Sequence, residues 1–312
     1  MYSLVIPVYK NEQSLPALLL AIERLGRSLQ DKLEAVFVVD GSPDESLHVL
    51  ETALPGCGFP SRLVQLSRNF GSFAAIRAGL QEAAGPYFAV MAADLQEPPE
   101  LIRDFFRALE DEPFDVAVGV RGHRDDPVVS RLAAEIYWGL YRRLVQREMP
   151  SGGVDVFGCN LAVRDRLISL PESNSSLVGL LFWVGFRRKM VPYQRRARSY
   201  GKSAWTFRGK LRYFSDSVFA FSDLPTLALI AIGVVGLVVS TTFGTLVVIA
   251  RLLGWIAVPG YAAIIITTVF FAALNAFGLG IVGSYVWRAF ENTKQRPNAI
   301  VMSRVRFEGT RR

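Results

Sequence analysis

The sequence predicts an α/β domain with a mostly parallel sheet and helices on both faces, followed by a helical membrane segment. Short apolar runs alternate with helical apolar spacing as far as Val120, and the runs end in polar or turn-forming residues. These two observations predict the domain. The membrane segment is predicted by a third, since Arg251 is the only charged residue between Asp223 and Arg288.

Five strands are expected from apolar runs that each stop at a loop or a turn. The runs are Tyr2–Val8, Leu33–Val39, Leu63–Leu66, Tyr87–Ala92 and Asp115–Val120. Four helices are expected among these strands. The first begins after its N-cap Ser14, the second after Asp44 and the third after Gly71, and the fourth spans Pro99–Glu110. Strands that alternate with helices favour parallel pairing, because each crossover helix returns the chain to the same end of the sheet.

A ligand site is expected where the fourth strand ends. Pro98 and Pro99 stop that strand, because proline cannot continue a sheet ladder. A strand order of 3-2-1-4 would bring the ends of strands one and four together at a switch point, where open α/β sheets bind ligands. The polar residues at that edge are Tyr9, Glu12, Asp94 and Gln96, with Asp40 one strand further over.

Phosphate at this edge would need a positive group that the usual motifs do not supply. The first helix lacks a G-x-G-x-x-G opening, and the sequence has no P-loop lysine. A divalent metal, Mg²⁺ or Mn²⁺, held by Asp94 is the simplest candidate, because hard cations bind carboxylate and phosphate oxygens together.

The second half of the chain predicts membrane attachment. Residues 207–223 show the pattern of an amphipathic interfacial helix. Residues 224–287, broken at Pro259-Gly260, are long enough for two spans of about 20 residues. Residues 288–312 form a basic tail. Gly278, Gly280 and Gly283 would permit close helix contacts in a homo-oligomer.

The distribution of charge favours a membrane surface over nucleic acid. The net charge is +7, no nucleic-acid motif is present, and Lys and Arg residues flank the apolar block. The positive-inside rule places the N-terminal domain and the tail in the cytoplasm. We therefore expect a multi-pass protein of the inner (plasma) membrane that binds no nucleic acid.

Several stretches together resemble the glycosyltransferase family 2 enzymes that act on polyprenyl phosphate. The resemblance is to the dolichyl-phosphate mannose synthase-like enzymes, in their bacterial form with two C-terminal membrane helices, and it covers nearly the whole chain. The stretches are Ile6-Pro7-Val8-Tyr9 with Asn11-Glu12, Asp40-Gly41-Ser42, Ser67-Arg68-Asn69-Phe70-Gly71, Asp94-Leu95-Gln96 with Pro98-Pro99-Glu100, and Gly201-Lys202-Ser203.

The resemblance implies a GT-A domain over residues 1–206 and inverting transfer of a sugar from a UDP- or GDP-sugar to a membrane polyprenyl phosphate. Its implied nucleotide-sugar contacts are Pro7, Tyr9, Glu12, Asp40, Ser42 and Asp94. Asp94 and Gln96 match the metal positions. The candidates for the acceptor phosphate are Arg121, Arg131, Arg198, Lys202 and Ser203. Catalysis is expected to involve Asp94, Arg121 and Asp155, the last as an orienting group or base.

Two positions depart from the family pattern. Ala92 stands where the first aspartate of Asp-x-Asp is usual, and Val39 replaces the first of two acidic residues in the nucleotide loop. Two other functions therefore stay open. One is a nucleotide-sugar-binding protein with impaired catalysis, and the other is a scaffold for a lipid-linked sugar. Transferase activity of the pure protein would argue against both.

Overall fold

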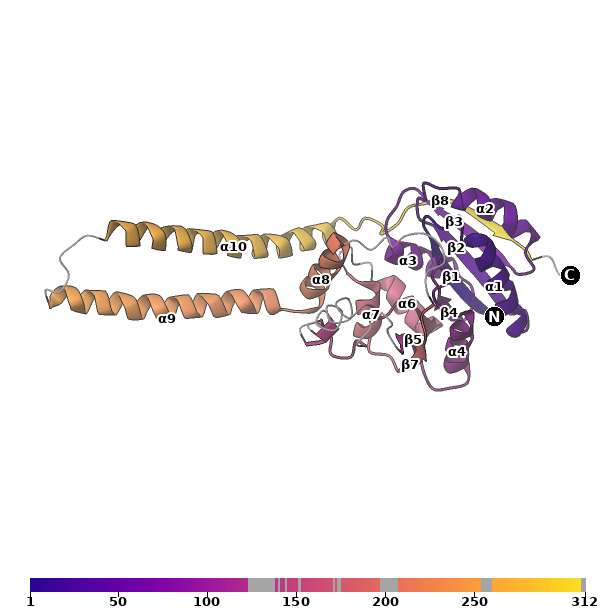
Figure 1. The fold of residues 1–312 in the computed structure, drawn as a ribbon, viewed down its shortest axis with the longest axis horizontal. Coiled ribbons are helices and arrows are strands. Elements are labelled where there is room, and N and C mark those ends of the chain that lie inside the picture. Colours follow the sequence, from indigo (N-terminus) through magenta and orange to yellow (C-terminus); the bar gives the residue numbers. More distant parts are fainter. Residues whose placement is uncertain are drawn as a thin grey trace.

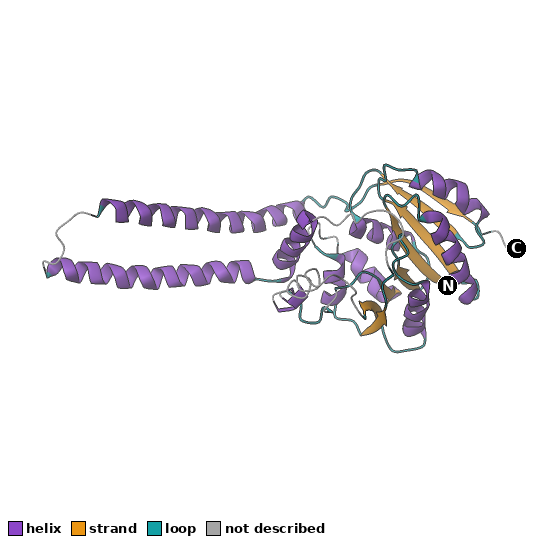
Figure 2. Ribbon diagram, in the orientation of Figure 1, coloured by secondary structure: helices purple, strands orange, loops and turns teal. Residues whose placement is uncertain are grey.

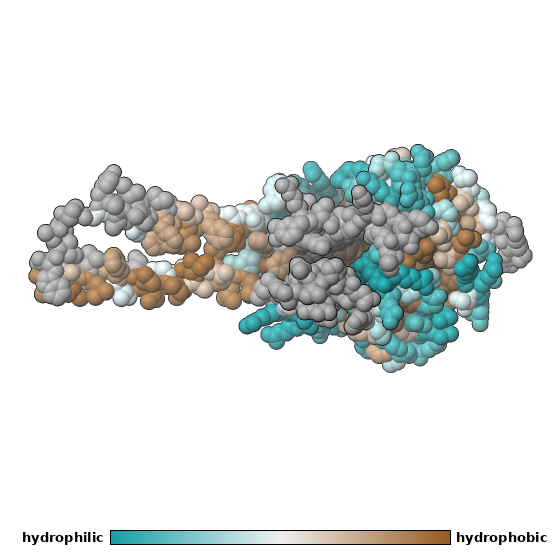
Figure 3. Space-filling model, viewed as in Figure 1, coloured by the Kyte–Doolittle hydropathy of each residue, from teal (hydrophilic) through white to brown (hydrophobic). Residues whose placement is uncertain are grey.

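The chain forms an α/β domain from which a long pair of helices projects (Figures 1 and 2). The computed structural model describes residues 1–122, 138–139, 141–143, 145–150, 153–170, 172, 175–196, 207–253 and 260–309. Apolar side chains dominate the projecting pair, whereas the visible surface of the domain is largely polar (Figure 3). The predicted α/β fold with two apolar helices near the C-terminus is confirmed.

The described part of the chain forms an eight-stranded sheet in the order β7-β5-β6-β4-β1-β2-β3-β8. Its strands are β1 (Tyr2–Val8), β2 (Leu33–Val39), β3 (Ser61–Leu66), β4 (Tyr87–Val90), β5 (Val116–Arg121), β6 (Phe157–Asn160), β7 (Arg188–Tyr193) and β8 (Val301–Phe307). The pairs β1–β2, β1–β4, β2–β3 and β5–β7 are parallel. The predicted order 3-2-1-4 and the mostly parallel sheet are therefore confirmed.

Helices cover both faces of the sheet, and alternate side chains of β1 pack into the hydrophobic core on each face. Leu4 and Ile6 join a cluster with α1, α2 and α4, whereas Val5 points to the other face and packs with α3, α6 and α7. Side chains alternate along a strand, so a fully apolar run fits a sheet buried on both faces. The helices are α1 (Leu15–Ser28), α2 (Ser46–Ala53), α3 (Ser72–Glu82), α4 (Pro99–Glu110), α6 (Leu161–Ser169) and α7 (Leu177–Trp183), with a 3₁₀ turn at Leu54–Gly56.

Three strands were not expected from the sequence. β6 has four residues, β7 begins with Arg188 and Lys189, and β8 lies in the segment predicted as a basic tail. The last finding corrects the predicted domain boundary, because β8 pairs antiparallel with β3 and belongs to the sheet. The apolar run 177–186 forms a helix only as far as Trp183.

The projecting helices begin and end at the domain (Figure 1). They are α9 (Leu224–Leu252) and α10 (Tyr261–Thr293), preceded by α8 (Phe207–Phe221). Leu224–Leu246 and Phe270–Thr293 are long and apolar enough to cross a membrane. Asp216 Oδ1 of α8 accepts a hydrogen bond of 2.7 Å from Arg288 Nη2 of α10, which joins these two helices.

Strand β8 connects the chain that follows α10 back to the α/β domain. Its register sets Leu63 opposite Val305, and Arg304 Nε donates to Glu82 Oε1 at 2.6 Å. Without β8, the hydrogen-bonding edge of β3 would be open to solvent and to other strands.

Removing residues 299–312 is expected to lower the thermal unfolding midpoint by on the order of 5 °C, because the ladder with β3 is lost. The midpoint is measured on detergent-purified protein, together with the aggregated fraction by gel filtration. Removal of 310–312 alone is the control and should leave both unchanged. An unchanged midpoint in the longer deletion would show that β8 adds nothing to stability.

Candidate functional site

The loops that follow β1 and β2 are joined by a side-chain network. Ser42 Oγ donates to Asp44 Oδ1 at 2.5 Å and accepts from the Lys10 amide at 2.7 Å. Asp44 Oδ2 accepts from the Glu12 amide at 3.1 Å, and Glu12 Oε2 accepts from the Glu45 amide at 2.9 Å. The two loops therefore hold each other in place at the carboxyl end of the sheet.

Asp44 is the centre of this network. Burial raises the pKa of its carboxyl, but hydrogen bonds from Ser42, Ser46 and the Glu12 amide outweigh burial and hold the pKa below its ordinary value. Two predicted nucleotide contacts, Ser42 and Glu12, thus use their side chains to shape the loops. Their contact with a nucleotide stays a prediction.

Asp40 follows β2 and fixes a third loop. It is 2% exposed, and its two oxygens accept hydrogen bonds from the Phe70 amide at 2.7 Å and the Gly71 amide at 2.9 Å. Burial raises the pKa of this carboxyl, and the two backbone bonds oppose the rise. Gly41 has a φ of +56°, and a Cβ there would overlap the backbone of Arg68.

An Asp40→Asn variant is expected to lose about 1–3 kcal/mol of stability, because an amide nitrogen cannot accept one of the two backbone bonds. Chemical unfolding of the detergent-purified chain measures the loss. Asp31→Asn, in the exposed turn before β2, is the control. Equal stability of the Asp40→Asn variant and the unchanged chain would contradict this role.

Pro7 and Tyr9 lie beside Asp40. Pro7 is opposite Val38 in the β1–β2 register, and the Asp40 amide donates to the Val8 carbonyl at 3.0 Å. The Tyr9 amide donates to Asn11 Oδ1 at 3.0 Å. Both predicted nucleotide contacts therefore sit at the edge where β1 and β2 end.

The turn after β4 presents Asp94 at the same edge. Ser14 stands at the N-cap position of α1, but its hydroxyl donates to the Ala93 carbonyl at 2.8 Å and makes no cap bond. Leu95 adopts a left-handed φ of +56°, and the Gln96 amide donates to Asp94 Oδ1 at 3.3 Å. The predicted cap is thus corrected, because Ser14 connects α1 to the Asp94 turn.

Gln96 contacts the segment that follows β7. Its Oε1 accepts from Arg195 Nη2 at 2.7 Å, its Nε2 donates to the Arg196 carbonyl at 3.3 Å, and its carbonyl accepts from the Arg196 amide at 2.8 Å. A carbonyl oxygen that faces a guanidinium is poorly placed to bind a cation as well. In this structure Gln96 holds the 195–196 segment, and its role as a metal ligand stays a prediction.

Strand register brings Arg121, Asp155 and Tyr193 together. Val118 is opposite Phe157 in the antiparallel β5–β6 pair, which brings Arg121 at the end of β5 beside Asp155, two residues before β6. Arg121 is also opposite Tyr193 in the parallel β5–β7 pair. Because these partners come from three separate segments, only the sheet topology makes them neighbours.

Asp155 is the shared acceptor of this group. Its Oδ2 accepts from Arg121 Nε at 2.6 Å and from the Tyr193 hydroxyl at 3.0 Å. Burial lowers the pKa of the Arg121 guanidinium, but the charge of Asp155 outweighs this effect, so the pKa is raised and Arg121 stays charged. Burial also raises the pKa of Tyr193, and Asp155 adds to the rise. Arg121 and Asp155, predicted to act separately, are therefore one ion pair.

Glu97 is the least satisfied acidic group of the described site. Its side chain is 1% exposed, and neither carboxyl oxygen has a hydrogen-bond partner among the described residues. Arg195 Nε lies 3.9 Å from Glu97 Oε1 without a hydrogen bond. The pKa of Glu97 is raised to about 7, because burial and the charges of Asp94 and Asp155 together outweigh the opposing charge of Arg195.

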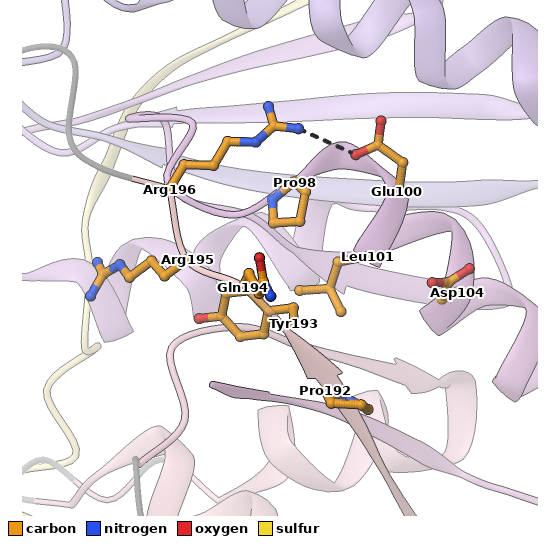
Figure 4. Close-up of a pocket in the computed structure, with 9 residues that line it drawn as sticks. All are labelled: Pro98, Glu100, Leu101, Asp104, Pro192, Tyr193, Gln194, Arg195 and Arg196. Carbon is orange, nitrogen blue, oxygen red and sulfur yellow. Dashed lines mark ion pairs between the residues drawn. The ribbon is translucent and has the colours of Figure 1, made fainter. Parts of the chain in front are cut away.

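A shallow pocket of about 520 Å³ lies next to this group, between the first turns of α4 and the segment after β7. Figure 4 shows Arg195 and Arg196 pointing away from one another, with Arg196 directed toward Glu100. Arg196 Nη2 and Glu100 Oε2 are 3.7 Å apart. The pocket is lined by Pro98, Glu100, Leu101, Asp104, Pro192, Tyr193, Gln194, Arg195 and Arg196.

Sequence reasoning covered only part of this group. Arg131, Arg198, Lys202 and Ser203, the other predicted acceptor-phosphate residues, lie outside the described residues. Glu97, Tyr193 and Arg195 had no assigned role. A sequence signal exists for two of them. Glu97 lies between a polar strand end and two prolines, and Arg195 begins a basic run.

The described residues fit a cation that completes its coordination with a substrate. Within them, no three His, Cys, Asp or Glu side chains are arranged as a metal cage. Mg²⁺ is usually held by one or two carboxylates together with substrate phosphates, so such a cage is not required. Asp94 at a strand end and the unpartnered carboxyl of Glu97 supply oxygen donors of the required kind.

Known proteins match the chain over most of its length. The model of the family described as "Glycosyl transferase family 2" matches residues 3–169. An undecaprenyl-phosphate 4-deoxy-4-formamido-L-arabinose transferase of Klebsiella pneumoniae is 29% identical over 312 residues, covering 97% of this chain and 93% of that protein. A prophage bactoprenol glucosyl transferase homolog of Escherichia coli is 26% identical, covering 96% and 97%.

A solved structure resembles the α/β domain. It is glucosyl-3-phosphoglycerate synthase from Mycobacterium tuberculosis in complex with Mn²⁺, uridine diphosphate and phosphoglyceric acid, with a TM-score of 0.50, 17% identity, and coverage of 70% of this chain and 76% of that one. At this identity the likeness concerns the fold alone. It agrees with the GT-A-like arrangement expected for the domain.

Proposed function

This chain belongs to glycosyl transferase family 2, and on that premise we propose that it transfers a sugar from a nucleotide sugar to a membrane polyprenyl phosphate, with inversion at the anomeric carbon. One observation carries the proposal. Relatives named for an undecaprenyl-phosphate or a bactoprenol acceptor cover at least 96% of this chain, the α/β site and the helical pair together. A site for a soluble acceptor alone would not need that pair.

The donor is proposed to bind where β1, β2 and β4 end. Pro7, Tyr9 and Asp40 would face the nucleoside, on loops that Ser42 and Glu12 hold through Asp44. Asp94 would lie nearest the diphosphate, on the turn that Ser14 supports. A solved structure of similar fold contains uridine diphosphate, which supports a UDP-sugar as the donor. A GDP-sugar stays a prediction from the resemblance.

The reaction needs no strong base. A phosphate oxygen of the acceptor is already anionic at neutral pH, so it can attack the anomeric carbon as the bond to the nucleoside diphosphate breaks. The main barrier is repulsion between two phosphate-bearing substrates, which fixed positive groups offset. Arg121 and Arg195 are two described guanidiniums at the site, and a guanidinium suits phosphate because it donates two parallel hydrogen bonds.

A divalent cation, Mg²⁺ or Mn²⁺, is proposed as the cofactor. When bound, it would neutralise charge on the leaving diphosphate. Asp94 would hold it from the protein side, and the solved structure of similar fold that contains Mn²⁺ with uridine diphosphate supports this choice. Asp155 is proposed to orient Arg121, because its Oδ2 receives two of that guanidinium's donors, Nε at 2.6 Å and Nη2 at 2.5 Å.

The membrane arrangement follows from the same architecture. Helices α9 and α10 are proposed to span the inner membrane with the domain on the cytoplasmic side, in line with the basic residues on their flanks. Polyprenyl phosphate would then present its phosphate at the height of α8. A homo-oligomer through the α10 glycines stays a prediction. Gly278 faces Leu229 of α9, whereas Gly280 and Gly283 have open space beside them.

Transfer in detergent tests the function. The full chain is supplied with polyprenyl phosphate, a panel of UDP- and GDP-sugars, and Mg²⁺ or Mn²⁺, beside an Ala92→Asp variant. Glycolipid formation by the unchanged chain is expected, and the panel then names the donor. Activity of the variant alone would favour the impaired enzyme suggested by Ala92. No glycolipid from either protein would refute the transferase.

A further inference from the structure

Glu97 is a buried carboxyl group with an unusual lack of hydrogen bonds, and the proposed function gives it no role. A carboxyl group that leaves water without gaining hydrogen bonds carries a large desolvation penalty. The side chain of Glu97 is 1% exposed, and neither of its oxygens has a hydrogen-bond partner in any other described residue. A buried group in this condition marks a place where a partner from outside the chain binds.

The neighbours of Glu97 indicate the charge of that partner. The Arg195 guanidinium lies 3.9 Å from Glu97 Oε1 and 3.9 Å from Asp155 Oδ2, so both carboxylates border one side chain. Asp94 is three residues earlier on the same left-handed turn at Leu95. The Arg195 Nη2 hydrogen bond goes to Gln96 at 2.7 Å, so this guanidinium leaves Glu97 only partly neutralised. A second cation would complete the balance of charge.

The sequence around Glu97 supports the same view. Ala92 removes one carboxylate from the end of β4, and Glu97 places another within the same short turn. Asp94 is the other carboxylate of this turn. Two carboxylates together with phosphate oxygens are the usual protein environment of Mg²⁺.

We propose that Glu97 is the second protein ligand of the divalent cation and takes the place of the carboxylate that Ala92 lacks. The inference rests on the proposed function for the identity of the donor, whose diphosphate would complete the coordination. It adds Glu97 to the cation site expected at Asp94, with both carboxylates on one turn.

Cation binding is measured directly, by the paramagnetic resonance signal of free Mn²⁺ in titrations of the detergent-purified full chain with and without UDP at about pH 8, where carboxyl groups are ionised. Glu97→Gln is expected to weaken Mn²⁺ binding by about tenfold or more, since even groups that only support a ligand are worth about that much. Glu100→Gln is the matched control, because Glu100 is an exposed carboxylate three residues further on. It should bind Mn²⁺ as the unchanged chain does.

A rescue variant sharpens the test. Adding Ala92→Asp to Glu97→Gln is expected to restore most of the lost Mn²⁺ affinity, whereas a double variant that stays weak would refute the exchange of one carboxylate for the other. Gel filtration and the thermal midpoint verify that each variant is folded. Equal Mn²⁺ binding by Glu97→Gln and the unchanged chain, or no Mn²⁺ binding by the unchanged chain, would overturn the inference.

Glycolipid formation by the same preparation separates the two proposals. If the unchanged chain forms glycolipid and Glu97→Gln binds Mn²⁺ equally well, this inference is refuted and the proposed function stands. Glu97-dependent Mn²⁺ binding in a chain that makes no glycolipid would remove the function and leave the cation site standing.

Discussion

Asp94→Asn is expected to lower the rate of glycolipid formation by roughly 100- to 1,000-fold, the usual cost of removing one group that stabilises developing charge. The amide oxygen of asparagine can still accept the bond that the Gln96 amide gives to Asp94 at 3.3 Å, so the turn keeps its shape. What disappears is the negative charge nearest the proposed diphosphate. Steady-state transfer at saturating polyprenyl phosphate measures the effect.

Asp104→Asn is the matched control for this substitution. Asp104 is an exposed carboxylate on α4 that lines the neighbouring pocket (Figure 4). The same chemical change there should leave the rate within experimental error. A comparable loss in both variants would point to general electrostatics of the domain, and full activity of Asp94→Asn would remove Asp94 from the mechanism.

Protein treated with a chelator is expected to lose about 3 kcal/mol of stability as the pH rises from about 5 to about 8, through ionisation of Glu97. Burial raises the pKa of this carboxyl from 4.5 to about 7, and the charges of Asp94 and Asp155 contribute. Between those two values the folded chain holds a proton that the unfolded chain has released. Stability is therefore highest below the unfolded value and falls until the pH passes the folded one.

Glu97→Gln isolates this effect from the other titrating groups. The variant cannot ionise at position 97, so its stability should exceed that of the unchanged chain by an amount that grows with pH. Chemical unfolding at several pH values, with Glu100→Gln as control, gives the difference. Parallel pH profiles of the Glu97→Gln variant and the unchanged chain would contradict the buried ionisation.

The strands that could be predicted from the sequence are those buried on both faces. β2 is wholly buried, so every residue is apolar or paired, and a run such as Leu33–Val39 can hardly be anything else. β8 has mostly exposed residues, including Arg304 and Arg306. A strand at the edge of a sheet needs few apolar side chains, because its backbone provides most of the attachment, and hydropathy therefore missed it.

For the candidate site too, the sequence predicts residues that a local pattern marks but not contacts that depend on the fold. Asp40 and Asp94 were predicted because each follows an apolar run, and the structure places both at the carboxyl edge of the sheet. The pairing of Arg121 with Asp155 could not be predicted, because it depends on the antiparallel register of β6, a strand of four residues. The isolation of Glu97 depends on its surroundings in space, which a short motif does not contain.

The position of β8 sets the order in which the protein can be completed. The ribosome makes the first seven strands, then both apolar helices, and only afterwards the residues that close the β3 edge. Synthesis therefore leaves the sheet unfinished until the helical pair has emerged and, in the proposed topology, entered the bilayer. A nascent chain that fails to insert keeps an open strand edge, the feature by which unassembled chains aggregate and are removed. In the proposed topology, anchoring in the membrane precedes completion of the domain, so folding would favour chains already at the membrane.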